Sequence, residues 1–431
     1  MCGPFTRGVH LPTGAAVAGW RGVTRDGGSL LWDILWVWGE AFLRWLHLIA
    51  AIGWIGSSFY FIHLDYSLQQ RQGLPEHAYG EAWQVHGGGF YNMVKYLIAP
   101  ARMPDELTWF KWEAYATWIS GFALIVAIYY AGASLYLIDP AVLAIAPATG
   151  IAISITSLVL GWAIYDGLCR SPIGRNDTLL AAVGFAFIVA LAYAFTKVFS
   201  ARGAFMQIGA LIGTIMAANV LMVIIPGQRK VVADLIAKRA PDPMHGQRGK
   251  QRSTHNNYLT LPVVFVMISN HYPLAYATRF SWLILALVLV IGGLLRHFYN
   301  VRHQRQPSPW WTWGLAAICG LAIIWLSALG PATIDRPRKR ADAPPAAAAF
   351  QEVEAIVASR CSMCHAKEPV WAGITVAPKG VLLDTAARIK ANARDIFIAA
   401  VWSNAMPPSN VTHMTLKERE ALSAWASSER E

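Results

Sequence analysis

The sequence predicts an all-α protein in which a polytopic bundle of membrane-spanning helices is followed by a small helical domain. Hydrophobic residues make up 55 % of the 431 residues and charged residues only 14 %, well below the quarter that is typical of soluble domains. The 19 Trp residues suit a chain with many positions at a membrane–water interface. This composition excludes a soluble enzyme and a disordered chain.

Apolar runs of about 20 residues, the length needed to cross a bilayer, recur along residues 31–330. Residues 1–30 lack the continuous apolar stretch of a signal peptide and are expected to form a loose extension. The sixth candidate span is the weakest, because Asn270, His271 and Pro273 interrupt it. The expected spans, about eight in number, are 42–63, 114–138, 143–166, 178–198, 204–226, 258–276, 280–299 and 312–330.

The distribution of Lys and Arg predicts the orientation of the spans. The formal net charge of +11 belongs to the membrane part, since residues 341–431 carry nine basic and ten acidic side chains. The loops after the first, third, fifth and seventh spans hold the denser set of basic residues, so they are expected in the cytoplasm. Both termini should then lie in the periplasm of a bacterium. Nucleic-acid binding is not expected, because the basic residues do not alternate with aromatic ones on a soluble face.

A change of composition separates the membrane part from the C-terminal tail. Residues 331–350 are rich in Pro and Ala, which is typical of a semi-rigid linker. Residues 351–431 are expected to form a domain with helices over 353–360 and 384–402. Thr415 and Glu418 form a capping-box pattern that opens a last helix, which runs through about residue 427.

The tail contains the sequence Cys361-Ser362-Met363-Cys364-His365. This C-x-x-C-H pattern predicts one covalently attached c-type haem, in which both thiols bond the haem and His365 ligates the iron. A redox dithiol and half of a zinc site are the alternatives. A zinc site needs a second pair of ligands, whereas His413 is the only other histidine of the tail. A redox dithiol expects a βαβ setting, which a helical tail does not offer.

The second axial ligand is expected to be a methionine, because Met/His ligation raises the potential of the iron. Met406 lies in a proline-stiffened stretch between the two last predicted helices, and Met414 is the alternative. The tail resembles a small class I cytochrome c, in which the methionine loop has this form. Haem is attached to such motifs outside the cytoplasm, in agreement with the predicted periplasmic location of the tail.

Three groups of residues in the membrane part are candidates for chemistry. Arg44 and His47 are three residues apart and share one face of a helix; ionisable residues inside spans are costly and often functional. The glycines of the sequence 86–91, which begins with His86, allow a backbone to approach a ligand closely. The break at 270–273 is tolerated at membrane depth only where it is buried or lines a cavity. Functional and structural explanations of this break remain open.

The histidines of the membrane part fall into two predicted layers. His47 and His63 are 16 residues apart, about 24 Å along a helix. His47 and His271 are therefore expected in the outer half, and His63 and His297 near the inner face. Histidines paired across helices are candidate ligands of b-type haem, and hydrogen bonding within the bundle or substrate binding are the alternatives.

At these residues the chain resembles a known family. The sequences at 44–47, 53–60, 86–91 and 270–273 are similar to those of the bacterial membrane-bound urate hydroxylases, and the resemblance covers about residues 31–431. It implies a urate-oxidising domain over 31–330 in the bacterial inner membrane, fused to a cytochrome c domain over 351–431. The reaction it implies converts urate to 5-hydroxyisourate and passes electrons through the haem to a soluble cytochrome c or a terminal oxidase.

The resemblance also implies a urate site. A urate pocket needs a cation, amide-type hydrogen bonds and an aromatic surface, and Arg44, Asn270, His271 and Tyr272 offer such groups. His47 or His271 could remove a proton, and His86 is a further candidate. Two other functions remain as alternatives. The membrane part could be a quinol-linked electron conduit with b-type haems, or a transporter or assembly partner of a terminal oxidase.

Overall fold

The computed structural model describes residues 27–96, 100, 103–304, 306–329, 346–371, 374 and 376–428. The chain forms two compact units, residues 1–39 and residues 40–431. The predicted N-terminal extension at 1–30 and linker at 331–350 lie largely outside the described residues.

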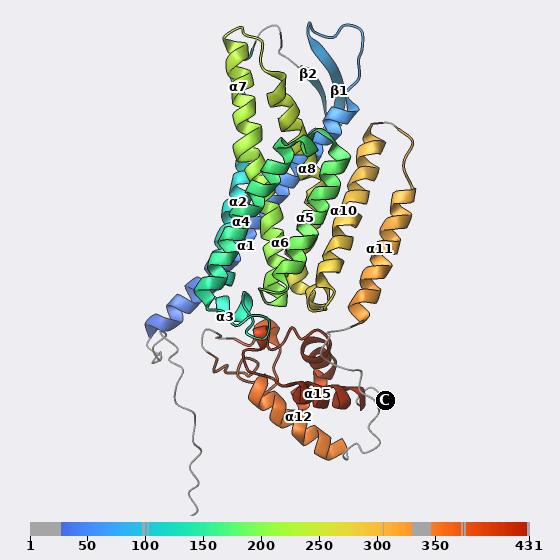
Figure 1. Cartoon of the computed structure of the whole chain (residues 1–431). Coiled ribbons are helices and arrows are strands. Elements are labelled where there is room, and N and C mark those ends of the chain that lie inside the picture. The colour runs from blue at the N-terminus through green and yellow to red at the C-terminus, as the bar shows by residue number, and fades with distance from the viewer. Residues whose placement is uncertain are drawn as a thin grey trace, which may run out of the picture. The chain divides into compact units, whose positions relative to one another are not determined.

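Long helices build the chain up to residue 329, and Figure 1 shows α5, α10 and α11 running alongside one another. Two π-helical segments, Ile125–Tyr130 and Asn219–Ile224, continue α2 and join α6 to α7. Two short helices, α3 (Ala133–Tyr136) and α9 (Pro273–Tyr276), lie between the long ones. The long helices are α1 (Gly27–Ser67), α2 (Trp112–Leu124), α4 (Pro147–Arg170), α5 (Asp177–Phe195), α6 (Ala201–Ala218), α7 (Ile225–Ile236), α8 (Pro243–Ile268), α10 (Ser281–His303) and α11 (Trp311–Ala328).

The number of candidate spans differs from the predicted eight. Among the residues that the structure describes, seven helices are long and apolar enough to cross a membrane: Ile34–Ser67, Trp112–Tyr130, Pro147–Arg170, Asp177–Phe195, Ala201–Ile236, Ser281–His303 and Trp311–Ala328. The expected span 258–276 is missing from this set. Its residues are divided between α8, a short 3₁₀ turn (Ser269–His271) and α9. The first half of α8 is polar and includes Arg248, Lys250 and Arg252. The apolar second half is therefore too short to count as a membrane span by itself.

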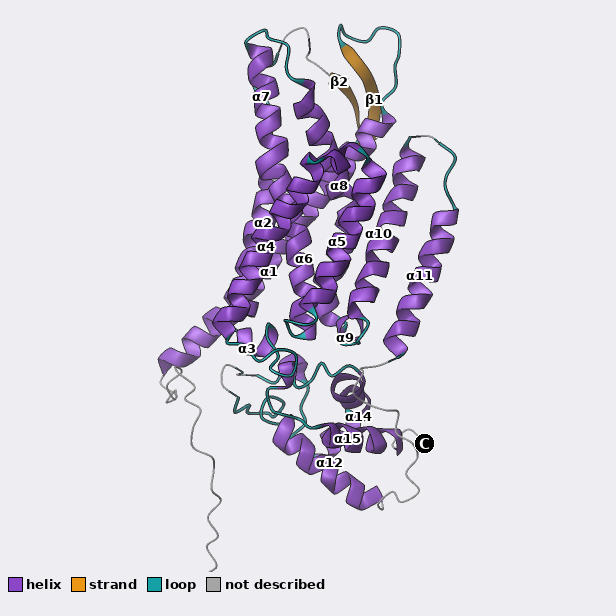
Figure 2. Ribbon diagram, viewed as in Figure 1, coloured by secondary structure: helices purple, strands orange, loops and turns teal. Residues whose placement is uncertain are grey.

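The all-α prediction is also incomplete, because the structure contains a β-hairpin (Figure 2). Strand β1 (Ala78–His86) pairs antiparallel with β2 (Gly89–Tyr96). Gly87 and Gly88 connect them with φ angles of +59° and +82°, as a two-residue hairpin turn with positive φ at both central positions requires. The glycines of this sequence therefore serve the turn, and a Cβ atom at either of these two would meet open space.

Helix α6 lies at the centre of the hydrophobic core. It packs against α2, α4, α5 and α8, and Ile208, Leu211, Ile212 and Ile215 on it are at most 1 % exposed. A helix surrounded by other helices is apolar on every side, which explains why the continuous helix 201–236 has the highest hydropathy of the seven.

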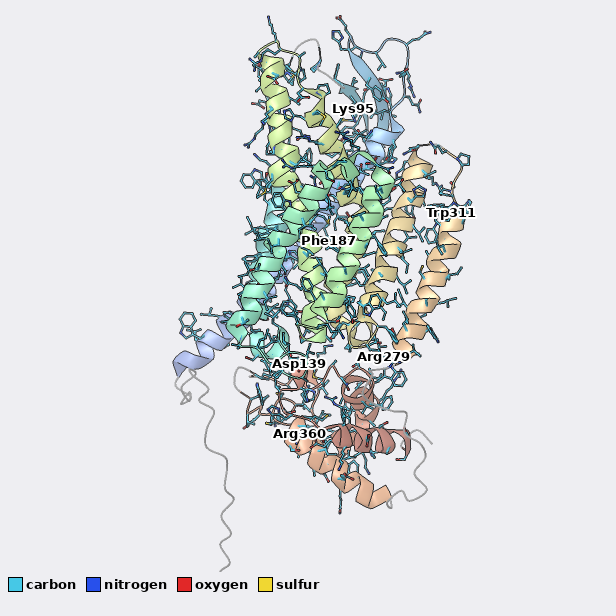
Figure 3. The ribbon with its side chains drawn as sticks, in the orientation of Figure 1. Lys95, Asp139, Phe187, Arg279, Trp311 and Arg360 are labelled. Carbon is cyan, nitrogen blue, oxygen red and sulfur yellow. The ribbon has the colours of Figure 1, made fainter. Side chains whose placement is uncertain are left out.

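The tail is a separate small helical core. It comprises α12 (Ala346–Arg360), α13 (Ala386–Ala391), α14 (Ala393–Ile396), a π-helical segment (Phe397–Trp402) and α15 (Leu416–Ser428). Val353, Val357 and Leu422 are fully buried in it. The predicted capping box is confirmed, since Thr415 N donates to Glu418 Oε2 over 2.6 Å and Glu418 N donates to Thr415 Oγ1 over 3.3 Å. Arg360, labelled in Figure 3, ties α12 to α15 through a 3.0 Å bond to Glu418 Oε1.

Candidate functional site

The break after α8 places the side chain of Asn270 among polar groups from two other helices. Its Oδ1 atom accepts hydrogen bonds from Tyr129 OH over 3.0 Å and from Arg202 Nε over 2.9 Å. Its Nδ2 atom donates to Met206 Sδ over 3.0 Å. Pro273 begins α9 directly after the break, so the chain leaves the helix here and Asn270 can point at α6. We call Tyr129, Tyr136, Arg202 and Asn270 the Asn270 cluster.

Arg202 gives this cluster its positive charge. It lies in the first turn of α6, and its guanidinium carbon is 5.2 Å from the centre of the Tyr136 ring. A guanidinium over an aromatic face is stabilised by the electrons of the ring. Tyr129 is 5 % exposed. The cluster thus brings a cation, an amide and two aromatic rings together, which are groups that can bind a planar anion.

The structure leaves two of the predicted site residues next to Asn270. His271 closes the 3₁₀ turn, and Tyr272 caps the start of α9. Both side chains are exposed. They are therefore accessible beside the half-buried amide of Asn270.

Three other predicted site residues lie elsewhere in the fold. Arg44 is exposed on α1 and pairs with Glu40, one turn earlier, over 2.9 Å. His47 Nδ1 lies 3.0 Å from Thr117 O and 3.2 Å from Ser120 Oγ, both on α2. His86 ends β1, at the turn of the hairpin. The cation at the Asn270 cluster is Arg202, a residue that no motif in the sequence singles out.

His63 and His297, the two histidines of the predicted inner layer, each contact a residue other than one another. His63 on α1 lies against His303 on α10, with ring centres 4.6 Å apart. His297 Nδ1 instead lies 3.4 Å from Tyr258 OH on α8. His303 was not among the predicted residues, because nothing in the sequence relates the end of α10 to α1.

The C-x-x-C-H segment follows directly on α12. Cys361 N donates to Val357 O over 2.9 Å, and His365 N donates to Cys361 O over 3.0 Å. The imidazole Nδ1 of His365 lies 2.9 Å from Val381 O. A carbonyl oxygen can only accept, so Nδ1 carries the proton and Nε2 keeps a free lone pair. This is the arrangement that orients a metal-ligating histidine, and it fits the axial ligand of a c-type haem.

The two candidate methionines lie in different surroundings. Met414 is 4 % exposed and belongs to the hydrophobic core of the tail. Met406 is half-buried in a loop outside that core. The backbone of Met406 is held on both sides, since its N–H donates to Ala399 O over 2.9 Å and its carbonyl accepts from Arg419 Nη1 over 3.0 Å. Met406, which lies outside the core, is therefore the better placed of the two to ligate a haem.

The two alternatives to haem attachment receive no support. Burial raises the pKa of Cys361 to about 12 and also raises the pKa of Cys364, whereas a redox-active dithiol needs a stabilised thiolate. In the part of the chain that the structure describes, no three His, Cys, Asp or Glu side chains gather as metal ligands. Cys361, Cys364, His365 and Met406 are the residues of the tail that would hold a c-type haem.

The family described as urate oxidase N-terminal matches residues 33–327. The chain belongs to this family. The match runs from α1 to α11 and includes the whole Asn270 cluster, while the tail lies beyond it. This urate oxidase family member has no match among curated proteins and none among solved structures.

Proposed function

We propose that this urate oxidase family member is a membrane-bound oxidoreductase that converts urate to 5-hydroxyisourate. One urate and one water give 5-hydroxyisourate, two protons and two electrons. The family match over residues 33–327 carries the proposal for urate. The long apolar helices support the membrane location.

The Asn270 cluster is the proposed urate site. Urate is a weak acid, so the guanidinium of Arg202 offsets the charge of its anion. The Asn270 amide nitrogen uses one of its two hydrogens in the bond to Met206, and the other can be donated to the purine edge. The rings of Tyr129 and Tyr136 supply the apolar surface. His271, exposed beside them, is the proposed acceptor of a proton from urate or from the attacking water. Arg44, His47 and His86 receive no role in this step, because their side chains lie in other parts of the fold.

The tail is the proposed electron acceptor. Cys361 and Cys364 would hold a haem c covalently, and His365 and Met406 would ligate its iron. The haem would supply one-electron redox chemistry, with a soluble cytochrome c or a terminal oxidase as the proposed final acceptor. The proposal is supported by a hydrogen bond of 3.0 Å from Ser409 Oγ to Leu135 O. Ser409 follows Met406 by three residues, and Leu135 directly precedes Tyr136 of the Asn270 cluster.

We infer the orientation from charge. The denser basic loops face the cytoplasm of a bacterium, and the tail faces the periplasm, where haem is attached. This orientation requires an even number of crossings. Helix α8 packs against α6 and α10, so its polar residues can be shielded by protein, and we propose that it crosses the inner membrane together with the seven apolar helices.

The test is an anaerobic optical titration of the oxidised, detergent-solubilised protein with urate. The reduced c-type haem band should grow in proportion to urate until two haems are reduced per urate. The variant H271A should lose most of this rate, and H413A, which changes an exposed histidine of the tail, should keep it. Full reduction by a quinol analogue with none by urate would overturn the proposal and favour the electron conduit. A pyridine haemochrome spectrum then reports whether b-type haem is present.

A further inference from the structure

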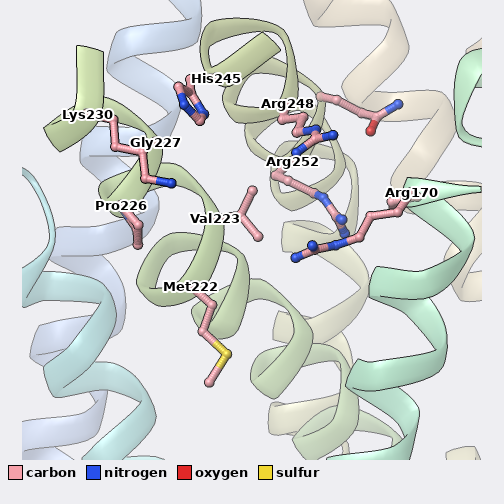
Figure 4. Close-up of a pocket in the computed structure, with 11 residues that line it drawn as sticks. Arg170, Met222, Val223, Pro226, Gly227, Lys230, His245, Arg248 and Arg252 are labelled. Atoms are coloured by element: carbon pink, nitrogen blue, oxygen red, sulfur yellow. The ribbon is translucent and has the colours of Figure 1, made fainter. Parts of the chain in front are cut away.

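A polar cavity lies at the end of the membrane helices that is remote from the Asn270 cluster. It has a volume of about 170 Å³ and lies between the end of α4, the beginning of α7 and the first half of α8. Figure 4 shows the guanidinium groups of Arg170, Arg248 and Arg252 on one side of it, and Lys230 and His245 on the other. None of the described side chains that line it is Asp or Glu. We call this cavity the basic pocket.

Arg252 is the buried anchor of the basic pocket. Its side chain is 3 % exposed, and its Nη2 atom donates to Asp166 Oδ1 over 2.6 Å. The guanidinium carbon is 4.9 Å from the centre of the Tyr165 ring. The Nε–H group is nevertheless buried without a hydrogen-bond partner. An unpaired donor of a buried cation is costly, so a ligand atom that accepts from it would be strongly favoured.

The charge of the basic pocket is not balanced by its own carboxylates. Asp166 is shared, because Arg170 Nε also lies 2.6 Å from its other oxygen. Lys230 and Arg248 are exposed at the rim. Four permanent cations therefore line the cavity, and the carboxylate of Asp166 is already bonded to two of them. A second carboxylate, that of Asp177, accepts a 3.4 Å bond from the lining residue Gln251.

The lower wall of the basic pocket is apolar. Met222 and Val223 line it, and Met222 and Leu221 of the same π-helical segment are about half exposed, at 52 % and 49 %. In a membrane, such side chains contact acyl chains. Cations above an exposed apolar helix surface form the arrangement that holds an anionic lipid, whose head group binds the cations while its chains cover the helix.

We propose that the basic pocket binds a phosphate-bearing anion, with an anionic phospholipid of the inner leaflet as the source that the apolar wall favours. The phosphate accepts from Arg252 Nε and from the rim cations Lys230 and Arg248. Soluble phosphate has the same chemistry and would bind the same cations, but it has no acyl chains that could contact Leu221 and Met222. The site is remote in sequence from the tail and does not depend on the proposed oxidation of urate.

The experiment measures lipid retention by the full-length protein in native mass spectrometry, with phosphatidylglycerol, phosphatidylcholine or inorganic phosphate added after delipidation. The wild type should retain phosphatidylglycerol far better than phosphatidylcholine. The double variant K230Q/R248Q should weaken its binding about fivefold per cation, the change that corresponds to about 1 kcal/mol for each basic side chain. K250Q is the matched control, since Lys250 is exposed on α8 and does not line the pocket.

Each outcome decides the proposal. Phosphate binding that the double variant weakens, without selective retention of phosphatidylglycerol, would keep the anion site and assign it to a soluble ligand. Equal retention of both lipids with no binding of phosphate, or equal losses in K230Q/R248Q and K250Q, would overturn the site. Arg252 is left unchanged in this design. Its removal would leave the buried carboxylate of Asp166 without this ion pair and could unfold the protein.

Discussion

Arg202 and Asn270 are joined by a hydrogen bond of 2.9 Å from the guanidinium Nε to the amide oxygen. The bond connects the first turn of α6 to the break after α8, two positions 68 residues apart in the sequence. It fixes the amide so that its carbonyl faces the cation and the Tyr129 hydroxyl. The break is thus held in one conformation by groups that also suit an anionic purine.

The first prediction concerns the charge of Arg202. Its replacement in R202M should raise the urate concentration for half-maximal haem reduction about ten- to a hundredfold, because a hydrogen bond to a charged group is worth about 1.5–3 kcal/mol. The urate concentration for half-maximal reduction should be intermediate in R202K, between the values of the wild type and R202M. The measurement is the anaerobic urate titration, with R279M as control, since Arg279 is exposed and stacks on Phe280. An unchanged titration of R202M would remove Arg202 from the urate site.

The second prediction separates Met406 from Met414. M406L should keep the covalent haem but lower its reduction potential, because methionine ligation raises the potential and axial ligands span about 0.8 V among haem proteins. M414L should keep the potential and cost less than about 1.5 kcal/mol of stability, as a volume-conserving change in a core does. Spectroelectrochemical titration of both variants measures this. If only M414L had a lower reduction potential, Met414 would be the iron ligand and Met406 would not.

Local patterns predicted the tail well. The capping box of Thr415 and Glu418 needs only residues three apart, and it is present as expected. The predicted helix 384–402 is present over residues 386–402, where it is interrupted at Asn392 and changes from an α-helix to a π-helix at Phe397. The hairpin was missed because the glycines at 87 and 88 can serve either a ligand-binding loop or a tight turn, and only the pairing of the flanking strands decides between them.

Long-range relationships could not be predicted from the sequence. Arg202 joins Asn270, and His63 joins His303, through contacts between distant helices, which no local spacing encodes. Close helix packing is a third case. Gly53 and Gly56 have the spacing of packing glycines. A Cβ atom at Gly53 would lie 3.7 Å from Glu113 Cγ, an ordinary contact, and one at Gly56 would meet nothing within 4 Å. The tight approaches lie at positions such as Gly209 and Gly292, where the partner is α8.

The third prediction uses one of these approaches. A Cβ atom at Gly292 of α10 would lie 2.4 Å from Cδ and 2.6 Å from Cγ of Pro262 on α8. The pyrrolidine ring cannot rotate away, so G292A should lower the stability of the membrane part by about 1–3 kcal/mol, the cost of overpacking. G293A is the matched control, because nothing lies within 4 Å of its Cβ position. Thermal unfolding in detergent should show a lower midpoint for G292A only.

The fourth prediction is a pH dependence of the tail. Partial burial opposes ionisation of Glu418, but the hydrogen bonds from Thr415 and Arg360 outweigh it and lower its pKa below the usual 4.5. A carboxyl with a lower pKa in the folded state stabilises the fold at every pH above its unfolded value. This contribution is lost as the pH falls through the folded pKa. The tail should therefore lose stability on acidification below about pH 4.5.

The variant E418Q separates this charge from the geometry of the cap. Glutamine can still accept the bond from Thr415 N, as capping boxes with Gln do, but it gives no ion pair to Arg360. E418Q should lower the free energy of unfolding of the tail by about 1 kcal/mol at pH 7. It should also reduce the difference in this free energy between pH 7 and pH 3. Denaturant unfolding followed in the Soret region measures both. E420Q changes an exposed carboxyl of the same helix and should keep the pH dependence of the wild type. If E418Q and the wild type lose equal stability on acidification, the sensitivity belongs to other groups, and Asp384, whose pKa Arg388 lowers, is the next to change.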